Sequence, residues 1–192
     1  MADEESTAPA VTSPLSLLQV GAAAGVWDLD PAASVLEFRV RHFWGAMTVR
    51  GRFGTVSGRL EVTATGTVSG RFEAEAASVD TKNGSRDKHL RSADFFDVAN
   101  HPSIVFSLDR VLPTGDDIVR ATGVLTVAGR SLPIAFDARL VEPDADHVTL
   151  DGEVSVDRRA DFGMKWSPLG MASSTAVLVV HATLVRSAEK AV

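Results

Sequence analysis

Residues 80–102 concentrate the side chains of this 192-residue chain that could do chemistry. Asp87 and His89 lie two positions apart, and a carboxylate beside an imidazole is the pair that activates a nucleophile or a water molecule. Ser85 and Ser92 are close in sequence, but the nucleophile elbow pattern Gly-x-Ser-x-Gly is absent from the sequence. We therefore predict no catalytic residue. A small hydrolase or metal-dependent enzyme that uses His89 and Asp87 stays an alternative.

Metal chemistry has little support in the sequence. The chain contains no cysteine, which excludes a thiol nucleophile and cysteine-ligated zinc. Its histidines show neither the His-x-x-x-His nor the His-x-His spacing of a metal-binding pair. We predict no metal site at the five histidines, which are His42, His89, His101, His147 and His181.

Turn and helix signals surround the Asp87–His89 pair. Residues 83–85, Asn-Gly-Ser, are typical of a turn, and Ser85 is placed to cap a helix. Apolar residues then recur near helical spacing until Pro102. The sequence predicts one short lid helix near residues 86–97. Its predicted underside is Leu90, Phe95 and Phe96, and its outer edge is Arg86, Asp87, Lys88 and Arg91.

Most of the remaining chain alternates between apolar and polar residues, as strands do when one face lies in a core. In residues 34–42 the apolar-side positions are Leu36, Phe38, Val40 and His42. About eight to ten such runs indicate an all-β fold, an antiparallel sandwich or barrel, which alternation alone does not separate. The strand length and the single lid helix favour a closed barrel, and we predict an antiparallel, eight-stranded one. A barrel of that size is filled by side chains or holds one small ligand, and Gly58 and Gly123 would leave room inside.

Composition and charge describe an ordinary globular domain. Hydrophobic residues make up 45% of the chain, and the net charge of −6 argues against nucleic acid as a partner. The N-terminus carries Asp3, Glu4 and Glu5 where a secretory signal carries basic residues, and Pro14 interrupts the apolar run that follows. We predict a flexible extension over residues 1–25, no integral membrane segment, and a cytoplasmic location.

Four motifs in order resemble the YceI-like family. Together they extend over nearly the whole chain, so we expect a YceI-like domain at residues 26–187, followed by a tail at 188–192. The motifs are residues 27–31 with 38–42, residues 49–54, residues 78–102 with the run Arg-Asp-Lys-His-Leu-Arg-Ser-Ala-Asp-Phe-Phe-Asp, and residues 123–129 with 159–163.

The resemblance implies an extended, lipocalin-like barrel that binds, sequesters or transports an isoprenoid quinone or a polyprenyl phosphate without catalysis. No cofactor is implied beyond the bound isoprenoid lipid, and pairing in some relatives leaves a homodimer open. This chain departs from many relatives in its lack of a recognisable secretion signal. It also departs in residues 165–171, which we expect to shape one mouth of the barrel.

The candidate tunnel residues are apolar side chains at inward positions, although each could instead fill a solid core. They are Phe38, Val40, Phe53, Leu90, Phe95, Phe106, Leu125, Phe136, Phe162, Met164 and Trp166.

The candidate head-group residues are His42, Arg86, His89 and Arg91. Arginine offers paired donors to phosphate, and imidazole can donate to a quinone carbonyl. Helix capping by Arg86 and solvation of Arg91 are the alternatives. We interpret Arg158, Arg159 and Asp161 as a structural ion-pair cluster, and a protein-interaction module would require an exposed apolar patch.

Overall fold

The structure, a computed structural model, describes residues 23–141, 146–164 and 172–188. Trp166 and the rest of the 165–171 loop lie outside the described residues, as do nearly all of the predicted N-terminal extension and most of the predicted C-terminal tail. No helix among the described residues is long and apolar enough to cross a membrane.

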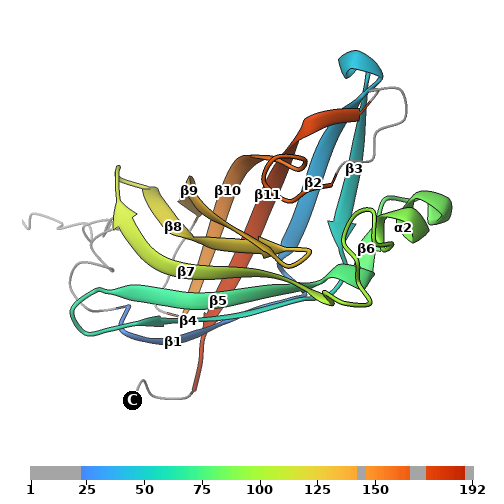
Figure 1. The fold of residues 1–192 in the computed structure, drawn as a ribbon. Coiled ribbons are helices and arrows are strands. Elements are labelled where there is room, and N and C mark those ends of the chain that lie inside the picture. The colour runs from blue at the N-terminus through green and yellow to red at the C-terminus, as the bar shows by residue number, and fades with distance from the viewer. Residues whose placement is uncertain (1–22, 142–145, 165–171, 189–192) are drawn as a thin grey trace, which may run out of the picture.

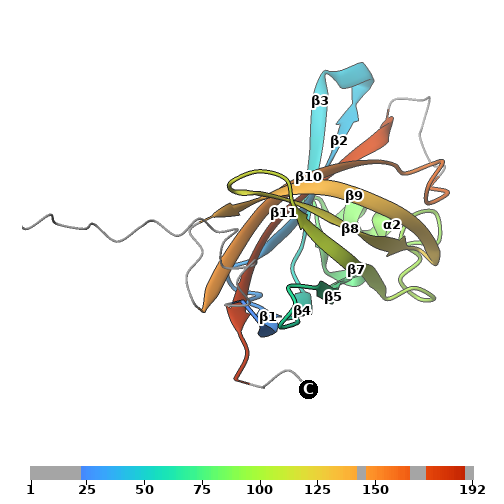
Figure 2. The same ribbon diagram turned by 90° about the vertical axis from the view of Figure 1, so that its left-hand side faces the viewer.

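Within these described ranges, eleven strand segments form one antiparallel sheet, in the order β1-β4-β5-β7-β8-β9-β10-β11-β2-β3-β6. Pairing of β1 with β11 closes it into a ring (Figures 1 and 2). The segments are β1 (Gly25–Leu29), β2 (Val35–His42), β3 (Met47–Phe53), β4 (Val56–Val62), β5 (Val68–Glu75), β6 (Val79–Asp80), β7 (Ser103–Pro113), β8 (Ile118–Val127), β9 (Arg130–Val141), β10 (His147–Asp157) and β11 (Ala172–Arg186).

Three pairs of consecutive segments act as bent strands. β1 and β2 share one edge of β11, while β4 pairs with β1 and β3 pairs with β2. In the same way β5 pairs with β4 and β6 pairs with β3. Counting each bent strand once confirms the predicted closed, antiparallel, eight-stranded barrel. The first bend is a turn after Asp30, whose carboxylate accepts from the backbone N–H of Ala32 at 2.8 Å.

The predicted helix is present but shorter than the 86–97 expected. α2 (Gly84–Leu90) is capped by Asn83, whose side chain accepts from the backbone N–H of Arg86, rather than by Ser85. Turns follow, because Ser92 donates its hydroxyl to the His89 carbonyl and Asp97 adopts a positive φ of 48°. These local bonds compete with continued helix.

The barrel interior is apolar, because alternate residues of each strand point inward. In β8, for example, every second residue is buried, and the residues between are half-buried or exposed; the buried ones are Val119, Ala121, Gly123, Leu125 and Val127. One buried cluster gathers around Phe38, Phe53 and Phe96 beside α2, and another around Trp27 and β1. In the first cluster, contacts between aromatic rings fix the segment after α2, since the ring centroids of Phe96 and Phe53 lie 5.6 Å apart.

Candidate ligand-binding cavity

An apolar cavity of about 890 Å³ occupies the barrel interior. It reaches from Trp27 in β1 to Leu90 in α2, and inward side chains of nearly every strand line it. Sites for small organic ligands commonly enclose roughly 300–1,000 Å³, so the interior is of a size to receive one. The barrel is therefore not a solid core.

The structure brings the predicted tunnel residues together on this cavity. Those among the lining are Phe38, Val40, Phe53, Leu90, Phe95, Phe106, Leu125, Phe136, Phe162 and Met164. Trp166, the remaining candidate, lies outside the described residues. Contact of these side chains with a ligand stays a prediction.

Four phenylalanine rings on the cavity wall lie over glycines of the neighbouring strand. The pairs, with the distance from a ring carbon to an added Cβ at the glycine, are Phe38 over Gly51 (2.4 Å), Phe72 over Gly58 (2.2 Å), Phe106 over Gly123 (2.8 Å) and Phe136 over Gly152 (3.2 Å). At Gly51 and Gly58 an added Cβ would push the ring toward the lumen, because only glycine permits so close an approach. At Gly123 it would first meet the Ser107 carbonyl oxygen, and at Gly152 the ring would need to move only slightly. Gly58 and Gly123, expected to leave room directly, thus make room for rings against the wall.

Basic side chains gather at the end of the cavity beside α2. His42, Arg86, His89 and Arg158 all line it there. Burial, followed by the positive charges of Arg158 and Arg86, lowers the pKa of His42 below its ordinary value. The two nearby guanidinium groups give this end of the cavity a positive potential, which would favour an anionic ligand group.

Arg158 is the residue of this basic end that the sequence analysis did not select. It is buried, and it donates to the carbonyls of Ser173 at 2.8 Å and Met164 at 3.0 Å, with its guanidinium 6.0 Å from the Phe95 ring centroid. Burial first, and then the charge of Arg159, lowers the pKa of Arg158. Arg158 therefore faces the cavity, apart from the ion-pair cluster that we predicted it to form with Arg159 and Asp161. Strand alternation carried one step further along β10, from Val154 and Val156 to Arg158, would have identified it.

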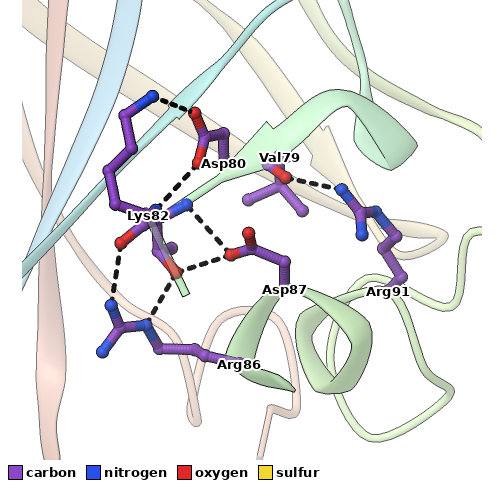
Figure 3. A network of polar contacts seen from close by, with 7 residues as sticks. Val79, Asp80, Lys82, Arg86, Asp87 and Arg91 are labelled. Carbon is purple, nitrogen blue, oxygen red and sulfur yellow. Dashed lines mark hydrogen bonds and ion pairs between the residues drawn. The ribbon is translucent and has the colours of Figure 1, made fainter. Parts of the chain in front are cut away.

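Two charged residues of α2, Arg86 and Asp87, hold the helix in place (Figure 3), whereas Lys88 is exposed. Asp87 is buried, and its carboxylate accepts from the Thr81 backbone N–H at 2.9 Å and hydroxyl at 2.5 Å. Arg86 donates to the Thr81 hydroxyl at 2.7 Å and carbonyl at 2.9 Å. The predicted outer edge is thus wrong for Asp87, because its buried carboxylate accepts from Thr81, which lies between β6 and α2.

Arg91 is likewise turned to the backbone. Its guanidinium donates to the carbonyls of Ala77 and Val79, both at 2.7 Å. Unlike the other three predicted head-group candidates, it is not among the described residues that line the cavity. We therefore expect Arg91 to anchor α2, and we reserve contact with a head group for the other candidates.

The side chains of the enzyme alternative face different partners. Asp87 turns its carboxylate to Thr81, whereas His89 lies with Nε2 3.3 Å from Asp94 and its ring 5.1 Å from the Phe95 centroid. Within the part of the chain that the structure describes, no three His, Cys, Asp or Glu side chains are grouped as metal ligands would be.

A closed antiparallel barrel around an elongated apolar cavity defines a cavity-bearing barrel of the lipocalin-like kind. The model of the YceI-like domain matches residues 27–184, so the chain belongs to the YceI-like family.

Relatives and solved structures agree with this membership. A UPF0312 protein of Azotobacter vinelandii is 30% identical over 175 residues, covering 88% of this chain and 90% of the relative. BcnA of Burkholderia cenocepacia has a TM-score of 0.73 at 18% identity, over 81% of this chain and 98% of that one. A polyisoprenoid binding domain from Saccharophagus degradans has a TM-score of 0.70 at 17% identity, over 84% and 98%. The YCEI protein of Campylobacter jejuni has a TM-score of 0.62 at 25% identity, over 73% and 86%.

Proposed function

We propose that this protein binds one isoprenoid lipid in the barrel, with the tail in the apolar cavity and the head group at the basic end beside α2. The observation that carries the proposal is the distribution of polarity within one cavity of about 890 Å³. Its lining is mostly apolar, and both arginines that line it, Arg86 and Arg158, lie with His42 at the end beside α2. A ligand with a long hydrocarbon chain and one polar end fits that distribution.

The tail accounts for affinity on simple physical grounds. Each buried methylene contributes about 0.8 kcal/mol, so a few isoprene units suffice for tight binding without polar recognition. The neighbouring polyisoprenoid binding domain from Saccharophagus degradans, which has the same fold, supports this class of cargo.

The head group selects among isoprenoids. Arg86 and Arg158 offer guanidinium donors, and His42 lies in their positive potential. Phosphate is the group that such donors recognise best, so we favour a polyprenyl phosphate over a neutral isoprenoid quinone. His89 can add a further donor at the same end.

Binding needs no catalytic group, and we propose a role in sequestration or transport rather than an enzymatic reaction. The cytoplasmic location and a homodimer stay predictions, as does the exclusion of nucleic acid as a partner.

Leu125→Arg tests the cavity assignment. Leu125 is buried and lines the cavity, so a charge there removes the apolar path of the tail. Val124, on the opposite face of β8, provides the matched control as Val124→Arg. We expect a titration with a polyprenyl phosphate to show binding by Val124→Arg and none by Leu125→Arg, with circular dichroism confirming that both are folded. Retained binding by a folded Leu125→Arg protein would exclude the cavity as the site.

A further inference from the structure

The hairpin that joins β2 to β3 ends in exposed apolar side chains. Its tip is the 3-10 turn η1 (Phe43–Gly45). Trp44 is 84% exposed, Met47 58% and Phe43 43%. Both views show this tip projecting beyond the other strands (Figures 1 and 2). Tryptophan is costly to leave in water, so a tip built this way is suited to contact with another apolar phase.

The backbone holds these side chains outward in an unusual conformation. Phe43 and Trp44 both have positive φ values, 50° and 53°, which bulky residues rarely adopt. The turn is closed by a hydrogen bond from the Ala46 N–H to the Phe43 carbonyl at 3.1 Å. Such conformations are concentrated at binding sites, where the exposed side chain has a use.

Arginines surround the tip, and acidic residues are missing from its sequence. Between Glu37 and Glu61 the chain contains no aspartate or glutamate, although its net charge is −6. Arg39 lies directly opposite Arg50 in the β2–β3 register, but its guanidinium is ion-paired with Glu37 at 3.2 Å and Glu153 at 3.1 Å. Arg41 and Arg52 lie on the same face by alternation and are exposed. The exposed Arg41, Arg50 and Arg52 therefore place positive charge behind an apolar tip.

The hairpin also adjoins the basic end of the cavity. His42, the last residue of β2, lines the cavity and pairs with Met47 across the hairpin and with Ala172 of β11. A surface that contacted the tip would thus be next to the end where we place the head group.

We propose that the β2–β3 hairpin docks the protein on an anionic lipid bilayer. Trp44, Phe43 and Met47 enter the interface, and the exposed arginines contact the lipid phosphates. Tryptophan combined with arginine is the composition of an interfacial anchor, and basic groups are attracted to anionic leaflets. Three apolar side chains are too few for the core of a stable protein interface, which favours the bilayer over a protein partner. The proposal goes beyond isoprenoid binding and does not depend on it.

Flotation of the full chain with vesicles tests the proposal. We expect co-flotation with vesicles of phosphatidylcholine and phosphatidylglycerol in equal parts, weaker at high salt, and little with phosphatidylcholine alone. Trp44→Ser should weaken binding roughly tenfold. The control Leu112→Ser, at an exposed leucine on β7 away from the hairpin, should leave it unchanged.

Charge is tested separately with paired substitutions. Each arginine near an anionic surface is worth roughly fivefold in binding, so Arg41→Gln with Arg50→Gln should weaken anionic-vesicle binding about 25-fold. Arg110→Gln with Arg120→Gln removes the same charge from β7 and β8 and should have little effect.

Three results would overturn the proposal: no vesicle binding by the parent protein, equal loss in the control variants, or a lipid-free dimer that Trp44→Ser dissociates without a change in vesicle binding. Isoprenoid binding in detergent, measured on the same variants, should stay normal. This binding measurement distinguishes the loss of membrane docking from the loss of isoprenoid binding in the cavity.

Discussion

Gly58→Ala should narrow the cavity by moving the Phe72 ring. An added Cβ at Gly58 would lie 2.2 Å from a carbon of that ring, so the ring must shift by roughly 1.5 Å to reach ordinary contact. Phe72 lines the cavity, so the open side of the ring is the lumen. The stability cost should be low for an overpacked site, about 1 kcal/mol, because the ring has empty space to enter.

The effect on binding should be larger. A ring turned into the lumen displaces about four methylene-sized groups of a bound tail, each contributing about 0.8 kcal/mol, for a total of about 3 kcal/mol. That corresponds to roughly 100-fold weaker binding of a polyprenyl ligand, which isothermal titration would measure. Gly84→Ala is the matched control, because an added Cβ at Gly84 meets nothing within 4 Å.

A double-mutant cycle identifies the cause. In a Phe72→Ala background the ring is gone, so Gly58→Ala should have little further effect on affinity. Equal losses from Gly58→Ala with and without Phe72 would refute the reasoning, as would a folded Gly58→Ala protein with unchanged affinity.

Three other predictions concern α2 and the basic end. Asp87→Ala leaves the Thr81 N–H and hydroxyl without their acceptor, which should lower the free energy of unfolding by about 3 kcal/mol. The melting temperature should fall by roughly 6–12 °C in a thermal scan, and a change below about 2 °C would contradict the buried network. The pKa of His42 is lowered in the empty protein, and a bound phosphate should raise it. Polyprenyl phosphate affinity should therefore increase as pH falls through and below about 6.5, and His42→Asn should reduce that increase in parallel titrations. Arg158→Gln should weaken polyprenyl phosphate binding about tenfold more than quinone binding, whereas Arg91→Gln should affect both alike; equal effects of Arg158→Gln on the two ligands would make it structural.

The strands and their inward faces could be predicted from the sequence because alternation in each strand reports directly on burial, whereas closure into a barrel rather than a sandwich is not encoded by alternation. Positions Phe38, Val40 and His42 in residues 34–42, for instance, all line the cavity as their spacing requires. The ends of α2 were harder to predict, since side-chain hydrogen bonds of Asn83 and Ser92 begin and end the helix, and several other polar residues nearby could have done so.

The basic end and the hairpin tip depended on contacts distant in sequence. Arg158 was assigned to an ion-pair cluster because acidic and basic residues adjoin it, but its guanidinium bonds to carbonyls of residues that follow it and faces the cavity. The exposure of Trp44 follows from how far the hairpin extends past its neighbours, which alternation does not encode. The glycine–phenylalanine pairs are also invisible without the strand register that places Phe72 opposite Gly58.

Native mass spectrometry of the freshly purified protein, followed by organic extraction, tests the central claim most directly. We predict a discrete added mass, and release of an isoprenoid lipid that Leu125→Arg fails to retain. A protein that is empty on purification and stays empty after incubation with polyprenyl phosphates and isoprenoid quinones would contradict isoprenoid binding in the cavity.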